Sequence, residues 1–372
     1  MKKTLLAAAL LAGFAGAANA QSNVTLYGIA DVGFLNDKTE GSKARNGIDS
    51  GLGAQSRWGI RGSEDIGNGL KAIFQLESGF NIDDGTSTQG RLFGRYAFVG
   101  LESARAGRLT LGRTTNLGFM WAAGIVNPFG LSYSRSSIGT TFGYNQGDFG
   151  TGSRVNNSAY YYSPVIAGFQ AAVGYSFAAG NTVPAAGGGT LEQEVAGNGN
   201  NSRLIDVGLK YENGPLKGVA TYSYTNLSDA AQAFNAGEKP QNLIVGASYD
   251  FGVVAAYAGW SHMKNPLNNV GGALVSPTGA NYTNNFAGLY GNDNAYTVGL
   301  SAPLGAGKVM AAYQKTTKSE IDGYAVGYVY DLSKRTNVYA FFNDYDQRQF
   351  VTRTNYTDVS RRQLAFGLQH KF

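Results

Sequence analysis

The sequence predicts an all-β chain that forms a 16-stranded antiparallel transmembrane β-barrel. Apolar and polar residues alternate with a period of two, tight turns alternate with long polar connections, and charged residues are scarce. Only 15% of the 372 residues are charged, whereas about 25% is usual in soluble chains. The chain has 53 Gly, 23 Tyr and 20 Phe, and it has no Cys. The absence of Cys excludes disulfide scaffolds, thiolate zinc sites and cysteine nucleophiles.

The first twenty residues have the features of a secretory signal. Lys2 and Lys3 form a charged start, an apolar stretch follows, and Ala18-Asn19-Ala20 is a small-x-small cleavage site. The apolar stretch is too short for a stable membrane span, and no later segment approaches the 18 or so apolar residues of a transmembrane helix. We therefore predict a signal peptide over 1–20 and a single barrel over 21–372.

Period-two alternation is clearest in the last segment of the chain. Its predicted apolar face comprises Leu364, Phe366, Leu368, His370 and Phe372, and its polar face Arg361, Gln363, Gly367, Gln369 and Lys371. The same period recurs over 24–34, 169–177 and 205–211. Such alternation predicts strands with one apolar and one polar side. Taken singly, each segment would equally suit a strand of a soluble sandwich.

The connections decide between a sandwich and a barrel. Seven tight turn signals rich in Gly, Pro or Asn lie at 66–69, 103–107, 164–168, 212–215, 250–252, 303–307 and 331–335. Eight other connections, mostly longer and polar, lie near 37–52, 83–90, 114–153, 178–201, 227–239, 264–291, 318–320 and 346–359. Fifteen connections imply sixteen strands. Short connections at one end, long ones at the other and an even strand count are typical of outer-membrane barrels.

Aromatic residues at the strand ends fit the same interpretation. The pairs in question are Tyr175 and Phe177, Tyr222 and Tyr224, Tyr249 and Phe251, and Tyr328 and Tyr330. They suit the aromatic girdles at the two membrane interfaces. No domain boundary is visible, because alternation resumes on both sides of the Gly-, Ala- and Asn-rich stretch 178–201. Closure is required in lipid, since an open sheet edge would leave backbone groups unpaired.

Six segments, in this order, carry a resemblance to a known family. They are Asn23–Gly28 (NVTLYG), Ser56–Asp65 (SRWGIRGSED), Phe74–Phe80 (FQLESGF), Leu92–Leu101 (LFGRYAFVGL), Thr110–Arg113 (TLGR) and Gly367–Phe372 (GLQHKF). The chain resembles the Gram-negative general porins of the trimeric, sixteen-stranded kind, and most of all those of β-proteobacteria. The resemblance implies a homotrimer in outer-membrane lipid and lipopolysaccharide. It also implies that the C-terminal Phe372 is the assembly signal read by the barrel-assembly machinery.

The resemblance further implies a constriction where loop 3 folds inward and faces a ladder of arginines. By segment match the wall residues are Arg57, Arg95 and Arg154, with Arg61 a weaker candidate. Trp58 and Ile60 suit lipid, which places Arg57 and Arg61 in the lumen. Likewise Tyr96 and Phe98 are expected to face lipid, with Arg95 inward. An arginine facing lipid at mid-membrane costs about 2–4 kcal/mol, so an inward side chain is favoured.

The predicted loop 3 covers 114–153. It is rich in residues that can pack against a barrel wall: Phe119, Met120, Trp121, Ile125 and Phe129. Asn127-Pro128-Phe129-Gly130 resembles the family's Pro-acid-Phe-Gly tip but lacks the acid, and Ile29 stands where enteric members have a wall lysine. Asp148 is the only carboxylate of the loop, and Arg135 adds a base. The fixed charge at the constriction is therefore predicted to be positive.

Other chemistry finds little support. Gly305-Ala306-Gly307-Lys308 lacks the first Gly of a phosphate loop and is a turn. His262 and His370 are the only histidines, too few for a metal cluster, so no cofactor is expected. The resemblance to porins implies that the chain is not an enzyme. A calcium ion at a loop is one option left open, at Asp344 with Asp346 or at Asp83 with Asp84.

Three functions remain open from the sequence. The leading one is a passive diffusion porin for small hydrophilic solutes and ions in the outer membrane, anion-selective through its arginine ladder. The alternative is a substrate-selective channel of the same fold for anionic nutrients. The third is an adhesin whose loops bind host components. No feature points to nucleic acid.

Overall fold

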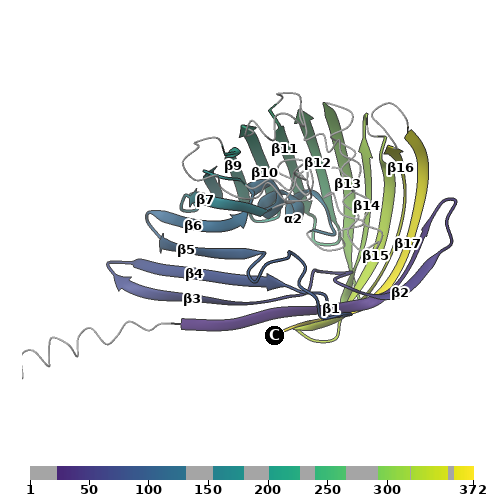
Figure 1. Ribbon diagram of the computed structural model, residues 1–372, viewed down its shortest axis with the longest axis horizontal. Coiled ribbons are helices and arrows are strands. Elements are labelled where there is room, and N and C mark those ends of the chain that lie inside the picture. Colours follow the sequence, from purple (N-terminus) through teal and green to yellow (C-terminus); the bar gives the residue numbers. More distant parts are fainter. Residues whose placement is uncertain are drawn as a thin grey trace, which may run out of the picture.

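The chain forms one closed sheet. The structure, a computed structural model, describes residues 23–130, 154–179, 201–226, 239–264, 292–318, 320–350 and 356–372. Over these residues the sheet has seventeen strands, coloured along the sequence in Figure 1. The strands are β1 (Asn23–Thr39), β2 (Arg45–Ser50), β3 (Arg57–Gly67), β4 (Leu70–Gly79), β5 (Tyr96–Ser103), β6 (Gly107–Thr115), β7 (Arg154–Tyr162), β8 (Phe169–Ser176), β9 (Arg203–Asn213), β10 (Leu216–Asn226), β11 (Gln241–Asp250), β12 (Ala255–Lys264), β13 (Asp293–Leu304), β14 (Gly307–Thr316), β15 (Asp322–Asp331), β16 (Thr336–Phe350) and β17 (Tyr356–Lys371).

The seventeen strands occupy sixteen positions in the barrel wall. Each strand from β3 to β17 runs antiparallel to the next, and β17 pairs with β1 to close the sheet. On the other edge of β1, β2 pairs with residues 32–37 and β3 pairs with residues 23–29. β2 and β3 are thus two halves of one barrel strand, interrupted by residues 51–56. The predicted sixteen-stranded antiparallel barrel is confirmed.

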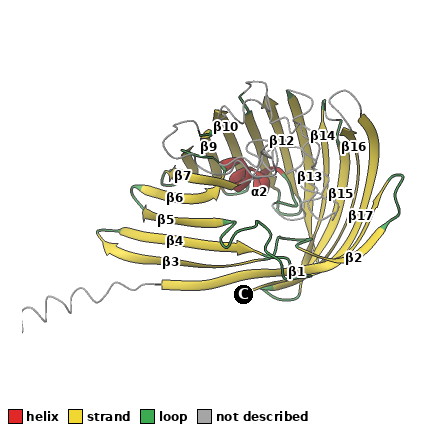
Figure 2. Ribbon diagram, viewed as in Figure 1, coloured by secondary structure: helices red, strands yellow, loops and turns green. Residues whose placement is uncertain are grey.

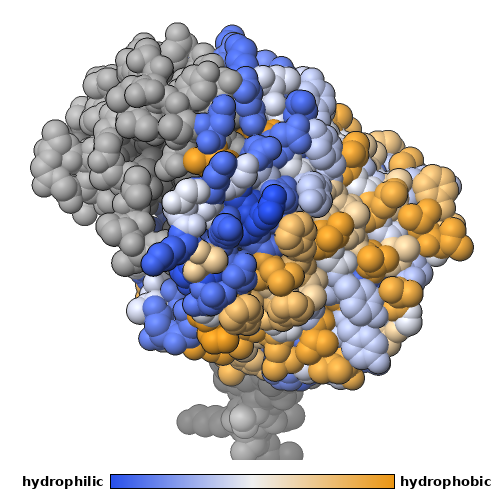
Figure 3. Space-filling view, turned by 90° about the vertical axis from the view of Figure 1, so that its right-hand side faces the viewer, coloured by the Kyte–Doolittle hydropathy of each residue, from blue (hydrophilic) through white to orange (hydrophobic). Residues whose placement is uncertain are grey.

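The two faces of the wall differ in polarity as the alternation predicts. Val24 and Leu26 of β1 point outward and are each 62% exposed. Between them lies Thr25, whose partner across the ladder is the inward-facing Arg61. Figure 3 shows the outer surface on one side, where hydrophobic side chains gather below a hydrophilic zone. An apolar outer band with a polar interior is the arrangement that lipid requires.

The seven predicted tight turns are confirmed, since each connects two strands that pair directly with one another. Two predicted long connections are wrong in extent. Residues 37–52 contain the end of β1 and all of β2, and β16 and β17 remain paired as far as Phe350 and Tyr356. Polar residues lie on both faces of these segments, so the pairing continues where the alternation that marks a membrane strand has ended.

Loop 3 enters the barrel directly after β6. It forms a π-helical turn, η2 (Gly118–Ala122), and one α-helical turn, α2 (Ala123–Val126). Figure 2 shows these helical turns on the inner side of the strands. Their buried side chains, Trp121 and Ile125 among them, join one apolar cluster with wall residues such as Tyr160. The inward fold is confirmed over residues 116–130, whereas 131–153 lie outside the described part. No helix within that part is both long and apolar enough to cross a bilayer.

The C-terminus completes the closure of the barrel. The backbone N–H of Phe372 donates to Gly28 O at 3.1 Å, and the N–H of Gly28 donates to Phe372 O at 3.0 Å. A Cβ atom at position 28 would overlap the ring of Phe372, so the ring lies directly against this glycine. The terminal residue therefore joins the last strand to the first, and Figure 1 shows the C-terminus beside β1.

Deleting Phe372 is expected to lower the amount of folded barrel without changing the amount of chain synthesised. The deletion removes two backbone hydrogen bonds of the closing seam and the ring that covers Gly28. Electrophoresis without boiling, in which folded barrels migrate differently, measures the folded fraction. The Phe372→Tyr variant is the control, because it retains the ring and the backbone. Normal folding of the truncated chain would contradict the proposed role of this residue.

Candidate functional site

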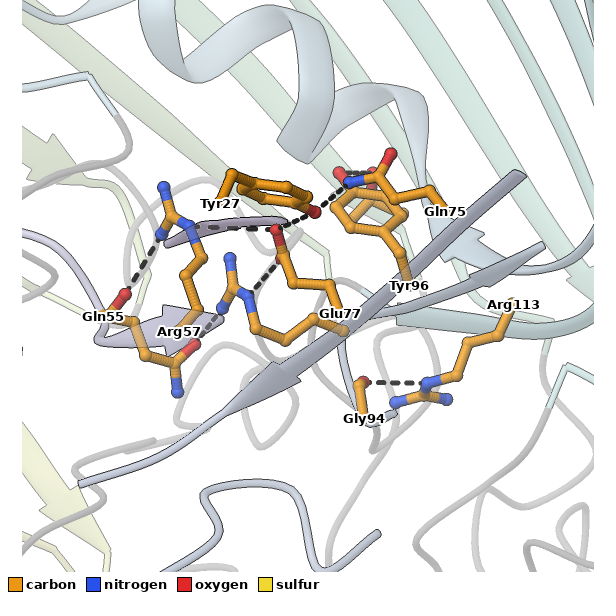
Figure 4. A network of polar contacts seen from close by, with 10 residues as sticks. Tyr27, Gln55, Arg57, Gln75, Glu77, Gly94, Tyr96 and Arg113 are labelled. Carbon is orange, nitrogen blue, oxygen red and sulfur yellow. Dashed lines mark hydrogen bonds and ion pairs between the residues drawn. The ribbon is translucent and has the colours of Figure 1, made fainter. Parts of the chain in front are cut away.

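A buried carboxylate, Glu77 of β4, organises one wall of the lumen. Glu77 is only 3% exposed. Its Oε2 accepts a hydrogen bond from the Tyr27 hydroxyl at 2.8 Å, and its Oε1 accepts one from Arg95 Nε at 2.6 Å. Arg57 Nε lies 4.0 Å from Oε2. Figure 4 shows Tyr27 and Arg57 converging on this carboxylate. One acid thus holds side by side Arg57 of β3 and Arg95, which directly precedes β5.

The segment 51–56, which interrupts the strand between β2 and β3, supplies the second support of these arginines. Arg57 Nη1 donates to the backbone oxygen of Gln55 at 3.1 Å, and Arg95 Nη1 donates to the Gln55 side-chain oxygen. The segment itself is fixed by buried Asp31, which accepts hydrogen bonds from the backbone of Gly53 at 3.1 Å and of Ala54 at 2.9 Å. Both guanidinium groups are therefore held in a defined orientation.

Two further arginines continue the cluster towards β7. Arg113 Nε donates to Gly94 O at 2.8 Å, and its Nη1 donates to the side-chain oxygen of Asn156. The guanidinium of Arg154 lies 5.4 Å from the ring centre of Tyr96 and 5.1 Å from that of Phe119 in loop 3. Distances in this range are favourable for a cation above an aromatic face. Arg113 pairs with Ala97, which alternates with Tyr96 and Phe98 in β5. Arg57, Arg95 and Arg154 are called the arginine wall below.

The predicted site residues are brought together in part. Arg95 lies close enough to interact electrostatically with both Arg57 and Arg154, so these three form one group, as expected. Arg61 faces the same lumen but lies four residues further along β3, where its guanidinium is 5.0 Å from the Tyr27 ring centre. Arg135 and Asp148 lie outside the described residues, so their position relative to the wall stays a prediction.

The prediction that Tyr96 and Phe98 face lipid is wrong. The cross-strand partner of Tyr96 is Glu77, and side chains opposite each other in an antiparallel pair lie on the same face. The Tyr96 hydroxyl also lies 3.2 Å from the Thr115 hydroxyl, and Val99, of the opposite parity in this strand, is the outward residue with 58% of its surface exposed, followed by Leu101. Arg95 precedes the first residue of β5, so the alternation of that strand does not govern its direction. The Tyr96 ring here lies beside the guanidinium of Arg154 rather than beside lipid.

Sequence reasoning missed Glu77 and Gln55. A signal for Glu77 was present, because Gln75 and Glu77 alternate with apolar Phe74 and Leu76 and so belong to the lumen face. No comparable signal marks Gln55. Its position depends on the interruption between β2 and β3, which has no signature in the pattern of apolar residues.

Loop 3 is anchored to the opposite wall at both ends of its described part. Asp206 of β9 is fully buried and accepts hydrogen bonds from Leu117 N at 2.7 Å, the Ser223 hydroxyl at 2.9 Å and the Tyr160 hydroxyl at 3.0 Å. Further along, the Asn127 side-chain amide donates to the Thr297 hydroxyl of β13 at 3.2 Å. The loop thus starts beside Arg154 and then runs along the β9–β13 wall.

The described parts of the two sides differ in charge. The arginine wall carries three guanidinium groups, and the carboxylate of Glu77 contacts two of them, those of Arg95 and Arg57. Residues 116–130 of loop 3 contain no charged side chain. A narrow aqueous passage with an excess of one charge on its wall concentrates counter-ions of the opposite sign. At the arginine wall itself the described fixed charge is therefore positive.

Metal sites find no support in the described parts of the chain, where no group of three or more His, Asp or Glu side chains lies together. The aspartates considered for calcium have other partners. Asp84 accepts hydrogen bonds from the backbone and hydroxyl of Thr86, and Asp344 accepts one from Arg362 at 2.9 Å. We therefore do not propose a calcium site at either pair.

Comparison with known proteins assigns the chain to a family. Residues 7–349 match the family described as Gram-negative porin. The chain belongs to the Gram-negative porins. An outer membrane porin protein of Bordetella pertussis is 39% identical over 406 residues, covering all of both chains. Outer membrane porin protein 32 of Delftia acidovorans is 34% identical over 351 residues, covering 91% of this porin and 88% of the relative.

Solved structures agree with this assignment. The anion-selective porin from Comamonas acidovorans superimposes with a TM-score of 0.70 at 25% identity, covering 95% of this porin and 100% of that chain. Salmonella typhi OmpF gives a TM-score of 0.65 at 16% identity, with 94% and 97% covered, which supports the fold. The protein is an outer-membrane diffusion channel of a Gram-negative bacterium, and its family and fold are those of channels rather than of enzymes.

Proposed function

We propose that this porin passes small hydrophilic solutes and ions passively and prefers anions, with the arginine wall as the origin of the preference. The observation that carries the proposal is the grouping of Arg57, Arg95 and Arg154, with Glu77 as the carboxylate beside Arg57 and Arg95. The likeness to a porin described as anion-selective adds support.

Burial strengthens the expected effect. Arg95 and Arg154 are only 7% and 5% exposed, so protein rather than bulk water surrounds most of each side chain. A charge in such surroundings is screened less than a surface charge, and its field extends further into the passage. The uncharged described part of loop 3 offers no opposing charge. Arg135 and Asp148 are proposed to add one charge of each sign and so to leave the balance positive.

A substrate-selective channel for anionic nutrients is the alternative for the same arginines. The two functions differ in how current depends on the concentration of a permeant anion. We propose simple diffusion, for which the current rises in proportion to the concentration of chloride or of a small carboxylate. A current that saturates at millimolar carboxylate, or chloride current that carboxylate blocks saturably, would instead support a binding channel.

We also propose that the porin is a homotrimer in outer-membrane lipid and lipopolysaccharide, assembled through recognition of its terminal Phe372. Exposed apolar side chains on the outer face, such as those of Val99, Leu101 and Leu111, suit either lipid or a neighbouring barrel. Mild detergent extracts run without boiling should contain a species of three times the monomer mass. A monomer as the only species would contradict the trimer.

A further inference from the structure

Four lumen-facing glycines lie on alternate strands of the wall against which loop 3 packs. They are Gly208 on β9, Gly246 on β11, Gly299 on β13 and Gly327 on β15. The strand between two successive glycines pairs with both of them. On that strand, the residues opposite the two glycines are two positions apart; on β10, for example, Thr221 lies opposite Gly208 and Val219 opposite Gly246. The same step recurs on β12 and β14, always in the same direction. The four glycines, called the glycine line below, thus follow one regular diagonal across the wall.

Side chains of loop 3 occupy the space that a side chain at each position of the glycine line would fill. A Cβ atom at Gly208 would lie 2.9 Å from the Trp121 ring, and one at Gly299 would lie 2.5 Å from Pro128 Cδ. At the other two positions, a Cβ atom would overlap Val126 at Gly246 and would lie 3.0 Å from the Phe129 ring at Gly327.

The order along the loop matches the order along the wall. Trp121, Val126, Pro128 and Phe129 follow one another in the sequence, as their glycines do from β9 to β15. Close approach of another group is a usual reason for glycine within a strand, where it otherwise weakens pairing. A chance distribution of glycines would not pair four successive loop contacts with four strands in order.

We propose that the glycine line is the seat of loop 3 and that it sets the distance between the loop and the arginine wall, and so the aperture of the pore. The proposal rests on the proposed function, in which solutes pass between these two sides. Adding one carbon atom to the seat pushes the loop away from its wall and into the passage. Conductance then falls, although neither the loop sequence nor any charged residue has changed.

Gly208 and Gly299 are the most informative positions for a test. At Gly208 the three atoms nearest to an added Cβ all belong to loop 3, namely two ring atoms of Trp121 and Cδ1 of Leu117. At Gly299 the two nearest atoms belong to the ring of Pro128, which cannot rotate away from the wall. Gly246 is less suitable, because a Cβ there would also lie 2.5 Å from the backbone oxygen of Ala258.

The experiment compares single-channel conductance of Gly208→Ala and Gly299→Ala with that of the parent porin and of Gly218→Ala. Gly218 lies in β10 near the same part of the wall, and no atom comes closer than 4.0 Å to its added Cβ. We expect a loss of conductance in the first two variants and none in the control. Unboiled electrophoresis verifies that each variant is folded.

A double variant separates displacement of the loop from damage to the barrel. In a Pro128→Ala background the ring that meets Gly299 is gone, so Gly299→Ala should cause no further loss of conductance. Comparing Pro128→Ala with the double variant also tests the proposal if Gly299→Ala alone fails to fold. Unchanged conductance in folded Gly208→Ala and Gly299→Ala, or an equal loss in the Pro128→Ala background, would overturn the proposal. The reversal potential of the parent tests the proposed function separately.

Discussion

Replacing both Arg57 and Arg95 with glutamine is expected to shift the reversal potential of the channel towards cations. The change removes two of the three guanidinium groups of the arginine wall and leaves Glu77 in place. Two unit charges about 4 Å from a passing ion together contribute about 2 kcal/mol even in bulk water. We therefore expect the anion-to-cation permeability ratio to fall by roughly tenfold or more. Conductance should stay similar or rise, because the new side chains are smaller.

Three variants control this experiment. Arg105→Gln removes an exposed arginine from the β5–β6 turn and should leave selectivity unchanged. The pair Arg57→Lys and Arg95→Lys retains the charge and should retain anion preference. Adding Glu77→Gln to the double glutamine variant removes the carboxylate and should restore part of the preference. It should also improve folding, because a buried charge left without its partner costs about 3–5 kcal/mol. No shift in the double glutamine variant would show that charge elsewhere sets selectivity.

Replacing Asp206 with alanine is expected to release the start of loop 3. The carboxylate accepts hydrogen bonds from Leu117 N and from the hydroxyls of Tyr160 and Ser223, and all of these groups are buried. Hydrogen bonds to a charged group contribute about 1.5–3 kcal/mol each, so this is the strongest polar anchor described between loop and wall. Single-channel recordings should show larger current fluctuations and a broader range of conductance levels than those of the parent.

The matched control for Asp206 is Asp322→Ala. Asp322 also accepts a hydrogen bond from a tyrosine, Tyr313, at 2.9 Å, but it lies in β15 on the outer face of the wall. Loss of the Asp322 carboxylate should not increase the current fluctuations. An Asp206→Asn variant keeps one side-chain oxygen and should give an intermediate result. Steady currents in folded Asp206→Ala would show that packing alone holds the loop.

The fold was predictable because its signals are local and repeat along the whole chain. Alternation identifies the lipid face of each strand, and the seven tight turns determine which strands pair. The division between β2 and β3 was not predictable, because polar residues continue on both faces around 37–52 while backbone pairing persists. In a part of the barrel wall outside the membrane, backbone hydrogen bonding defines the strands without an alternation of apolar and polar residues.

The site was predictable only in part, for a different reason. The lumen face of Arg57 followed from its apolar neighbours Trp58 and Ile60, and the register confirms it. The same reasoning failed for Tyr96, because an aromatic ring suits a guanidinium neighbour as well as it suits lipid. Asp206 could not be recognised, since a buried acid in a strand has the same pattern as any polar lumen residue.

The reversal potential of the unmodified porin in a gradient of potassium chloride tests the central claim most directly. The measurement is made first at low salt, where the fixed charges of the arginine wall are least screened. We predict a reversal potential with the sign expected when chloride permeates more easily than potassium. Its magnitude should fall as salt approaches 1 M, where the Debye length falls to about 3 Å. A preference for potassium at low salt would contradict the assignment of selectivity to Arg57, Arg95 and Arg154.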